Sequence, residues 1–191
     1  MSTIKVNNIQ SRTGNAISFT SGDTITIPSG ATLTNNGTTN IGITEADQWR
    51  LTATLSSNTD PISANLERVD TAGQGYLGTG MSVSSGIWTF PSTGIWRVSA
   101  TCRGYVTASD TLNFQIQATI DNSSYISVAQ GAIGDSGSAR VSTSTTCTLI
   151  DVTDTSNVKV KFSTNSFTSG LFEGSTTQNL TFFEFIRLGD T

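Results

Sequence analysis

The chain has 191 residues, of which 13% are charged, and its formal net charge is −4. The length suits one ordinary domain with an extension, and the lack of a basic cluster argues against a nucleic-acid partner, because phosphate binding needs concentrated Lys and Arg. No apolar run is long enough to cross a membrane, and the first residues lack the apolar core of a signal peptide, so we expect cytoplasmic synthesis and no membrane partner.

The first predicted element is an eight-residue repeat near the N-terminus. Its apolar positions are Ile9, Ile17, Ile25, Leu33 and Ile41, and three of the units also carry a Gly preceded by Ser or Thr. Neither an α-helix nor simple strand alternation produces a period of eight, whereas a short strand followed by a Gly-containing turn does. Such a unit cannot bury its apolar side alone, so it must stack on neighbouring units.

These neighbours are predicted to be the same segment of other chains. Ordering about forty residues costs at least ~1 kcal/mol each in backbone entropy, whereas full burial of one Ile contributes only about 1.5–3 kcal/mol. One arm therefore cannot hold itself ordered, but three arms around a shared axis bury each apolar position against its copies. We predict that residues 1–44 form a trimeric β stem with the five apolar positions at its interface; the alternative is a flexible arm whose Ile spacing is accidental.

Residues 45–191 are predicted to form a separate head. The eight-residue spacing ends and charge appears between residues 43 and 50, and short runs rich in apolar and β-branched residues follow, separated by turn sequences. Several runs alternate apolar and polar residues, as half-buried antiparallel strands require. We therefore predict an all-β head, a β-sandwich or jelly roll, with strands at 49–55, 66–69, 87–90, 94–106, 112–120, 125–132, 139–150, 158–162 and 179–188.

The two cysteines, Cys102 and Cys147, lie in predicted strands far apart in the sequence. We expect two buried, reduced thiols, because a protein made without a signal peptide stays in a reducing compartment; the alternative is a disulfide. Two cysteines are too few for a zinc site, and the chain has no histidine to complete one. We therefore expect neither a metal nor another cofactor.

Three patterns resemble catalytic or cofactor motifs, and each has a simpler interpretation. Residues 134–138 resemble the nucleophile segment of serine proteases, but the chain lacks the histidine base that this chemistry requires, so we predict a Gly-rich hairpin loop there. The spacing of Gly73, Gly75 and Gly78 matches a dinucleotide-binding pattern, yet the residues after it make a poor helix start, so we predict a loop. The carboxylates that could serve a glycosidase fall mostly in turns, where Asp is expected, so we predict no enzymatic activity; they are Asp110, Asp121, Asp135, Asp151 and Asp154.

Two stretches resemble the C1q/TNF family of jelly-roll proteins. Residues 86–98 contain an aromatic strand, a Phe-Pro corner and a Gly-x-aromatic sequence, as in that family's signature. Residues 181–188 resemble its closing strand, which places aromatic side chains at the centre of a trimer. The resemblance covers residues 47–191 and implies a homotrimeric jelly-roll head with Trp96, Phe183 and Phe185 at the interface between chains.

The N-terminal sequence and residues 27–33 are similar to small structural proteins of marine tailed bacteriophages, including cyanophages, in which a repetitive β arm precedes a C1q-like head. This resemblance implies a homotrimeric virion protein, either a fibre, a spike or a capsid decoration, whose partners are its own copies and capsid or tail proteins. The alternative that it leaves open is a receptor-binding tail-fibre head that recognises host surface glycan. A hydrolase of host polysaccharide is a third hypothesis.

Overall fold

The computed structural model of the chain describes residues 26, 29–32, 42–106, 110–134 and 139–191. The chain comprises two compact units, Met1–Thr39 and Asn40–Thr191. In the first unit, Ser29 and Gly30 form a turn in which Gly30 has a φ of 84°, a conformation that favours glycine. The apolar positions of the repeat lie outside the described residues, so the trimeric stem stays a prediction; these positions are Ile9, Ile17, Ile25, Leu33 and Ile41.

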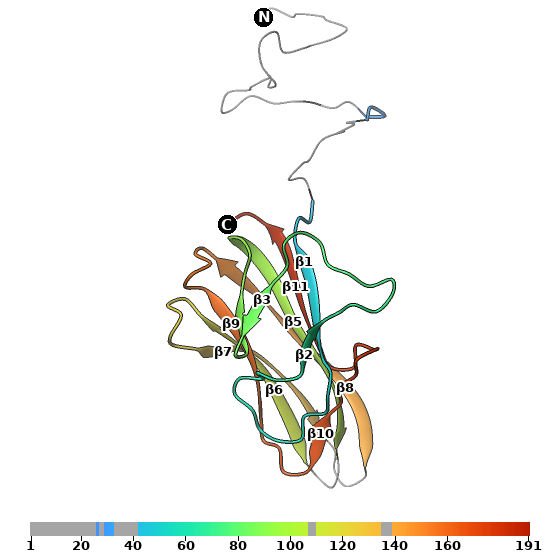
Figure 1. Ribbon diagram of the computed structural model, residues 1–191. Coiled ribbons are helices and arrows are strands. Elements are labelled where there is room, and N and C mark those ends of the chain that lie inside the picture. The colour runs from blue at the N-terminus through green and yellow to red at the C-terminus, as the bar shows by residue number, and fades with distance from the viewer. Residues whose placement is uncertain (1–25, 27–28, 33–41, 107–109, 135–138) are drawn as a thin grey trace, which may run out of the picture. The chain divides into compact units, whose positions relative to one another are not determined.

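The second unit contains two antiparallel sheets (Figure 1). Sheet 1 has the order β8, β5, β11, β1, β2, with β10 beside the part of β5 that β11 does not reach. Its strands are β1 Ala46–Leu51, β2 Leu66–Arg68, β5 Gly94–Val106, β8 Arg140–Val152, β10 Gly170–Phe172 and β11 Phe182–Gly189. Sheet 2 has the order β3, β4, β9, β6, β7, and its strands are β3 Ser82–Ser84, β4 Ile87–Thr89, β6 Thr111–Thr119, β7 Ile126–Gly134 and β9 Lys159–Asn165.

The predicted all-β architecture of two packed sheets is confirmed, since the described residues include no helix and hence none that could cross a membrane. Each predicted strand is found: the bounds of β5 agree with the prediction, and every other strand has at least one end displaced. The sequence missed β3 and β10, which have three residues each and are too short to show alternation. The predicted start of the first strand at Trp49 is wrong, because the strand begins at Ala46 and includes the charged Asp47, which is buried.

Strand β5 has partners on both sides, because β8 pairs with its whole length on one side while β11 and β10 share the other. Its side chains alternate between the core and the outer face of the sheet. Trp96, Val98 and Ala100 are buried, whereas Arg97 between them is half-buried on the outer face. This alternation is what a strand with one covered face requires, and it fixes which residues of neighbouring strands share each face.

Aromatic rings fill the space between the two sheets. Trp88 of β4 has no exposed surface, and its ring centroid lies 5.1 Å from that of Trp49, 5.0 Å from that of Phe185 and 5.9 Å from that of Phe162. Phe162 of β9 in turn stacks on Phe183 of β11 at 4.0 Å. These contacts join both sheets, since β4 and β9 belong to sheet 2 and the other partners to sheet 1.

The predicted head interface at Trp96, Phe183 and Phe185 is wrong. These side chains are 1%, 1% and 0% exposed within a single chain, so they belong to the core of the sandwich. A side chain that its own fold already covers cannot contact a second copy. The residues of β11 that face outward are the alternate ones, among them Glu184 and Ile186.

Candidate functional site

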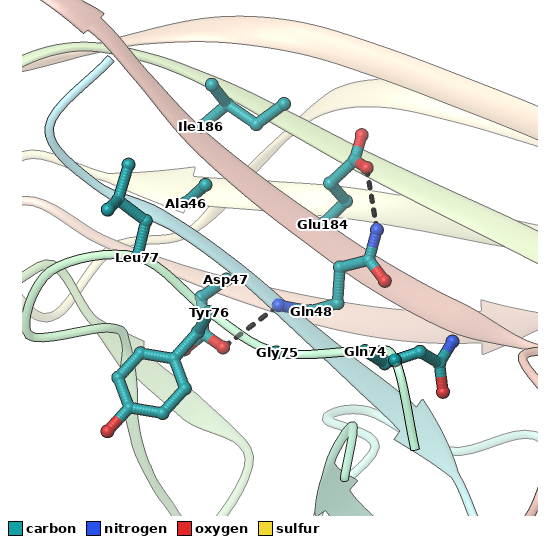
Figure 2. Close-up of a pocket in the computed structure, with 10 residues that line it drawn as sticks. Ala46, Asp47, Gln48, Gln74, Gly75, Tyr76, Leu77, Glu184 and Ile186 are labelled. Atoms are coloured by element: carbon teal, nitrogen blue, oxygen red, sulfur yellow. Dashed lines mark hydrogen bonds between the residues drawn. The ribbon is translucent and has the colours of Figure 1, made fainter. Parts of the chain in front are cut away.

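The first candidate site is a pocket of ≈ 440 Å³ on the outer face of sheet 1, which we call the loop pocket (Figure 2). Strands β1 and β11 form its floor, and the loop that follows β2 forms its wall. Because the outer side chains of two strands and a Gly-rich loop converge here, the pocket combines polar and apolar groups. The lining residues are Ala46, Asp47, Gln48, Gly73, Gln74, Gly75, Tyr76, Leu77, Glu184 and Ile186.

The polar floor of the loop pocket is held by hydrogen bonds. Gln48 Nε2 donates to Glu184 Oε1 at 3.0 Å, and Gln48 Oε1 accepts from Asn179 Nδ2 at 3.2 Å. Arg97 Nη1 donates to the other oxygen of Glu184 at 2.7 Å. Because these groups orient and neutralise one another, the floor offers a fixed polar surface for binding rather than a free acid or base.

The apolar wall of the loop pocket is partly exposed. Tyr76 and Leu77 are 53% and 48% exposed. The Arg68 guanidinium lies 4.6 Å from the ring centroid of Tyr76 and 4.9 Å from that of Trp49, so a cation–π contact on each side links the exposed ring to the core. An aromatic ring held in this way suits the binding of an apolar or flat partner.

The Gly-rich loop beside the pocket is anchored by Glu45. One carboxylate oxygen of Glu45 accepts hydrogen bonds from the N–H groups of Thr79 at 2.8 Å and Gly80 at 3.0 Å. At Gly78, φ is +78° and a Cβ would lie 2.4 Å from the Glu45 carboxyl group, so a side chain would displace this anchor. The segment with dinucleotide-like glycine spacing is therefore a loop, as predicted, with no helix after it in the part of the chain that the structure describes.

The second candidate site, which we call the flank, is the side of the sandwich where β7 and β8 lie next to each other. Strand β8 is an edge of sheet 1 and β7 an edge of sheet 2, and neither has a second strand partner in the described residues. A mainly apolar opening of ≈ 480 Å³ lies beside them. Four large hydrophobic side chains around it are exposed: Ile120 at 83%, Ile126 at 67%, Leu149 at 61% and Val128 at 37%.

Local geometry explains why the flank is exposed. Gly131 in β7 has no room for a side chain, because a Cβ there would lie 2.2 Å from the ring of Phe114, so the middle of β7 sits close against the core. A β-bulge between Ile116 and Gln117 of β6 then shifts the pairing, and Ile126 lies opposite Ala118. Val128 of β7 has no opposite residue at this bulge, and bulges bend a strand and re-aim its side chains, which accounts for the exposure of Val128 and Ile126.

The flank was not predicted from the sequence, although one signal was present. Leu149 and Ile150 are adjacent in a predicted strand, and successive side chains of a strand face opposite sides. One of the two therefore had to face away from the core. The structure buries Ile150 and leaves Leu149 on the outer face, opposite Arg97 of β5.

Two of the carboxylates considered as catalytic groups, Asp121 and Asp154, cap turns. Asp121 Oδ1 accepts hydrogen bonds from the N–H groups of Ser124 at 2.8 Å and Ser123 at 2.9 Å, and these bonds, led by that of Ser124, hold the pKa of Asp121 far below its usual range. Asp154 accepts from the hydroxyl and N–H groups of Ser156, which lower its pKa as well. Both groups are thus ionised structural acceptors, as expected for Asp in turns.

Two candidate carboxylates remain, Asp151 and Asp135, and Asp135 belongs to the segment that resembles serine proteases. Asp151 is exposed on the outer face of β8. Asp135 and residues 136–138 lie outside the described residues, so the predicted hairpin loop there stays a prediction. Over the described residues, no three His, Cys, Asp or Glu side chains come together in a way that could hold a metal ion.

Asp110 ties the loop before β10 to the start of β6. It is 7% exposed, and its carboxylate accepts hydrogen bonds from the N–H groups of Thr168 at 3.0 Å, Ser169 at 2.6 Å and Thr111 at 2.8 Å. Burial alone would raise the pKa of Asp110, but the hydrogen bonds from these three N–H groups outweigh it and lower the pKa.

We expect Asp110→Asn to unfold more easily at pH 7, by about 1–2 kcal/mol, because a buried charged acceptor is lost. A lowered pKa in the folded state stabilises the fold above the unfolded-state pKa of about 3.9, and this contribution is lost as the pH falls through the folded-state pKa. The variant should therefore lose less stability than the wild type between pH 7 and about pH 3, as urea unfolding would measure. Asp190→Asn, at a side chain that is 92% exposed, is the control, and equal losses in Asp110→Asn and wild type would contradict the assignment.

The two thiols are free and differ in their surroundings. Cys102 of β5 is 1% exposed, and burial raises its pKa far above the usual value, which makes it unreactive. Cys147 of β8 is exposed, so the prediction that both thiols are buried is wrong for this residue. It faces outward because it lies opposite Ser99, on the same face of sheet 1 as Leu149.

Comparison with known proteins identifies the fold of the head. Neither protein-family models nor curated proteins give a match to the chain. Among solved structures, the chain is similar to the Eiger TNF from S. frugiperda, with a TM-score of 0.59 and 11% identity over 78% of this chain and 95% of that one. It is also similar to murine APRIL, with a TM-score of 0.57 and 11% identity over 75% of this chain and 98% of that one. At this identity the likeness shows the fold alone, and the head is a TNF-like jelly roll.

Proposed function

We propose that the chain is a non-enzymatic structural protein of a bacteriophage virion, present as a homotrimer whose jelly-roll head lies on the particle surface. Capsid decoration, fibre component and spike are variants of this role, in which the protein stabilises or extends the particle through contacts with capsid or tail proteins. The similarity of the N-terminal sequence and of residues 27–33 to tailed-phage structural proteins supports the virion assignment.

The main support for the proposal is the exposure of the flank. Exposed strand edges are templates for uncontrolled pairing, and a contiguous apolar patch on a soluble protein usually marks an interface. The flank combines both features, because β7 and β8 are edge strands and Ile120, Ile126 and Leu149 are each more than half exposed. Further copies of the chain would cover these edges, and the C1q/TNF resemblance supports three as the number of copies.

The proposed mechanism is mechanical. In the described residues, the carboxylates at turns and in the loop pocket are engaged by hydrogen bonds, so the surface is suited to contacts rather than to chemistry. A trimer that covers its strand edges unfolds and dissociates slowly, which protects an exposed virion component against proteases and shear.

Two measurements test the proposal. Sedimentation equilibrium of the full chain should give three times the mass of the 20.1 kDa protomer at micromolar concentration. Antibodies raised against the purified protein should label the surface of intact particles in electron micrographs. A folded monomer at that concentration, or purified particles that lack the protein, would overturn the proposal.

A receptor-binding head is the second candidate, and the half-exposed Tyr76 ring in the loop pocket favours it, because sugars stack on such rings. In that case purified trimer should compete with virions for host cells and should bind host surface glycan. Adsorption that is unaffected by an excess of trimer would leave the structural role as the function.

A further inference from the structure

The outer face of sheet 2 consists mainly of amide and hydroxyl side chains, where β6 lies between β7 and β9 (Figure 1). In β6, Leu112, Phe114 and Ile116 are buried in the core, so the residues between them point away from sheet 1. The residues paired with these outward positions share the same face. We call this surface the amide face; its residues are Asn113, Gln115, Gln117, Gln130, Ser163 and Asn165.

Hydrogen bonds orient the side chains in the middle of the amide face. Gln115 Nε2 donates to Gln130 Oε1 at 2.9 Å, and Gln117 Nε2 donates to Ser163 Oγ at 2.7 Å. Within the described part of the chain, these bonds leave Gln130 Nε2 as an open donor and Gln117 Oε1 as an open acceptor. Because the groups are oriented before a ligand arrives, binding here costs less conformational entropy.

The charges around the amide face are already engaged. Lys161, at its border, forms an ion pair with Asp60 in which Nζ lies 2.7 Å from Oδ1. Lys159, farther along β9, is 9% exposed and donates to Thr89 Oγ1 at 3.0 Å and to the Thr155 carbonyl at 2.7 Å. Anionic polymers need clustered, free cations, so charge complementarity favours a neutral ligand on this face.

The remaining chemistry of the amide face suits sugars better than proteins. None of the exposed large hydrophobic side chains of the described residues belongs to it, whereas a protein interface usually has an apolar core. Beside it, the ring centroid of Tyr125 lies 4.9 Å from Lys161 Nζ, and this cation–π contact holds an aromatic ring at the border. Amides donate and accept hydrogen bonds, as sugar hydroxyl groups do, and an aromatic ring stacks on the C–H face of a sugar.

We propose that the amide face binds a neutral polysaccharide, with sugar hydroxyl groups on the glutamine amides and one sugar ring against Tyr125. The inference goes beyond the structural role, since it gives the receptor-binding candidate a surface and a class of ligand. It places the sugar on sheet 2, whereas the loop pocket with Tyr76 lies on sheet 1. The binding can therefore be measured separately from the oligomeric state and from the place of the protein in the virion.

Native electrophoresis of the full chain through gels that contain a polysaccharide measures this binding. The neutral probes are a mannan, a galactan and hydroxyethyl cellulose, and the anionic probes are alginate and dextran sulfate. We expect at least one neutral polymer to retard the protein and the anionic polymers to leave its mobility unchanged. No retardation by any of the three neutral polymers, or retardation by the anionic polymers alone, would overturn the proposal.

Two variants assign the binding to the amide face. The double variant Gln115→Ala/Gln130→Ala removes the amide pair and Tyr125→Ala removes the ring, and each should weaken binding by roughly tenfold. Circular dichroism checks that both variants stay folded, and Tyr125→Phe, which keeps a ring, should retain most of the binding. Tyr76→Ala in the loop pocket is the matched control and should bind like the wild type. If Tyr76→Ala abolishes retardation while the amide-face variants keep it, the proposal is wrong.

A protein partner on the amide face is the competing outcome, and incorporation into particles distinguishes it. The variant Gln115→Ala/Gln130→Ala should enter particles like the wild type and yet lose retardation by the neutral polymer. A double variant that is excluded from particles but is retarded like the wild type would assign the face to a capsid or tail protein and overturn the proposal. Neither result changes the trimeric mass or the surface labelling that test the structural role.

Discussion

Replacement of Asp47 by Ala is expected to lower the free energy of unfolding of the head by about 2–4 kcal/mol, because it removes a buried carboxylate that accepts several hydrogen bonds and pairs with the partly exposed Arg68. Asp47 is 2% exposed. Its carboxylate accepts hydrogen bonds from Trp49 Nε1 at 2.9 Å, the Met81 N–H at 2.7 Å and Arg68 Nε at 3.2 Å. Without the carboxylate, the buried Met81 N–H is left unpaired, and the Trp49 and Arg68 donors lose their partner in a partly buried region, so each loss costs free energy.

The effect should extend beyond β1, because Asp47 joins both sheets. Arg68 donates to the carbonyl of Met81 while Asp47 accepts from the N–H of the same residue, so the two side chains together hold the segment that leads into β3 of sheet 2. Arg68 also supports the ring of Tyr76 in the loop pocket. We therefore expect Asp47→Ala to loosen the loop pocket as well as the core.

Urea unfolding followed by tryptophan fluorescence measures this loss, at several protein concentrations so that dissociation of copies is distinguished from unfolding of the head. Asp190→Ala is the matched control, because the carboxylate of Asp190 is 92% exposed and pairs only at the surface with Arg187; we expect a change below about 0.5 kcal/mol. An Asp47→Ala protein as stable as Asp190→Ala would contradict the role of the buried network.

Alternating residues made the strands of the head predictable from the sequence. In β5, apolar side chains at every second position indicated a strand with one buried face, and the predicted bounds agree with the observed Gly94–Val106. The turn at residues 155–157 was equally clear from its Thr, Ser and Asn, since such side chains stabilise turns. Local patterns of this kind depend on a few neighbouring residues, so one sequence is enough to recognise them.

Such local patterns could not predict which face of a strand packs in the core and which face points outward. Residues 182–186 include apolar side chains on both faces of β11, and the family resemblance pointed to the aromatic ones as an interface. The structure buries Phe183 and Phe185 in the chain's own core and turns Ile186 outward. An offset of one residue exchanges the two faces of a strand, and only the position of sheet 2 decides between them.

Replacement of Trp88 by Ala is expected to lower the free energy of unfolding by about 3–5 kcal/mol, a large part of the roughly 5–15 kcal/mol that stabilises an ordinary domain. The indole has no exposed surface and contacts rings from both sheets, with centroid distances of 5.1 Å to Trp49 and 5.0 Å to Phe185. Ala would leave a cavity between these rings, so they would lose their packing contacts. Denaturant unfolding followed by circular dichroism measures the resulting loss of unfolding free energy.

A comparison of two Trp→Phe variants distinguishes ring packing from hydrogen bonding. Trp88 Nε1 is buried and has no hydrogen-bond partner among the described residues, so Trp88→Phe loses ring volume but no hydrogen bond, and we expect a cost of about 1–2 kcal/mol. Trp96 Nε1 donates to the Ser92 carbonyl at 3.1 Å, so Trp96→Phe should cost about 1 kcal/mol more than Trp88→Phe. If Trp88→Phe costs as much as Trp88→Ala, the contribution of Trp88 does not come from aromatic packing, because phenylalanine preserves most of the ring contacts that alanine removes.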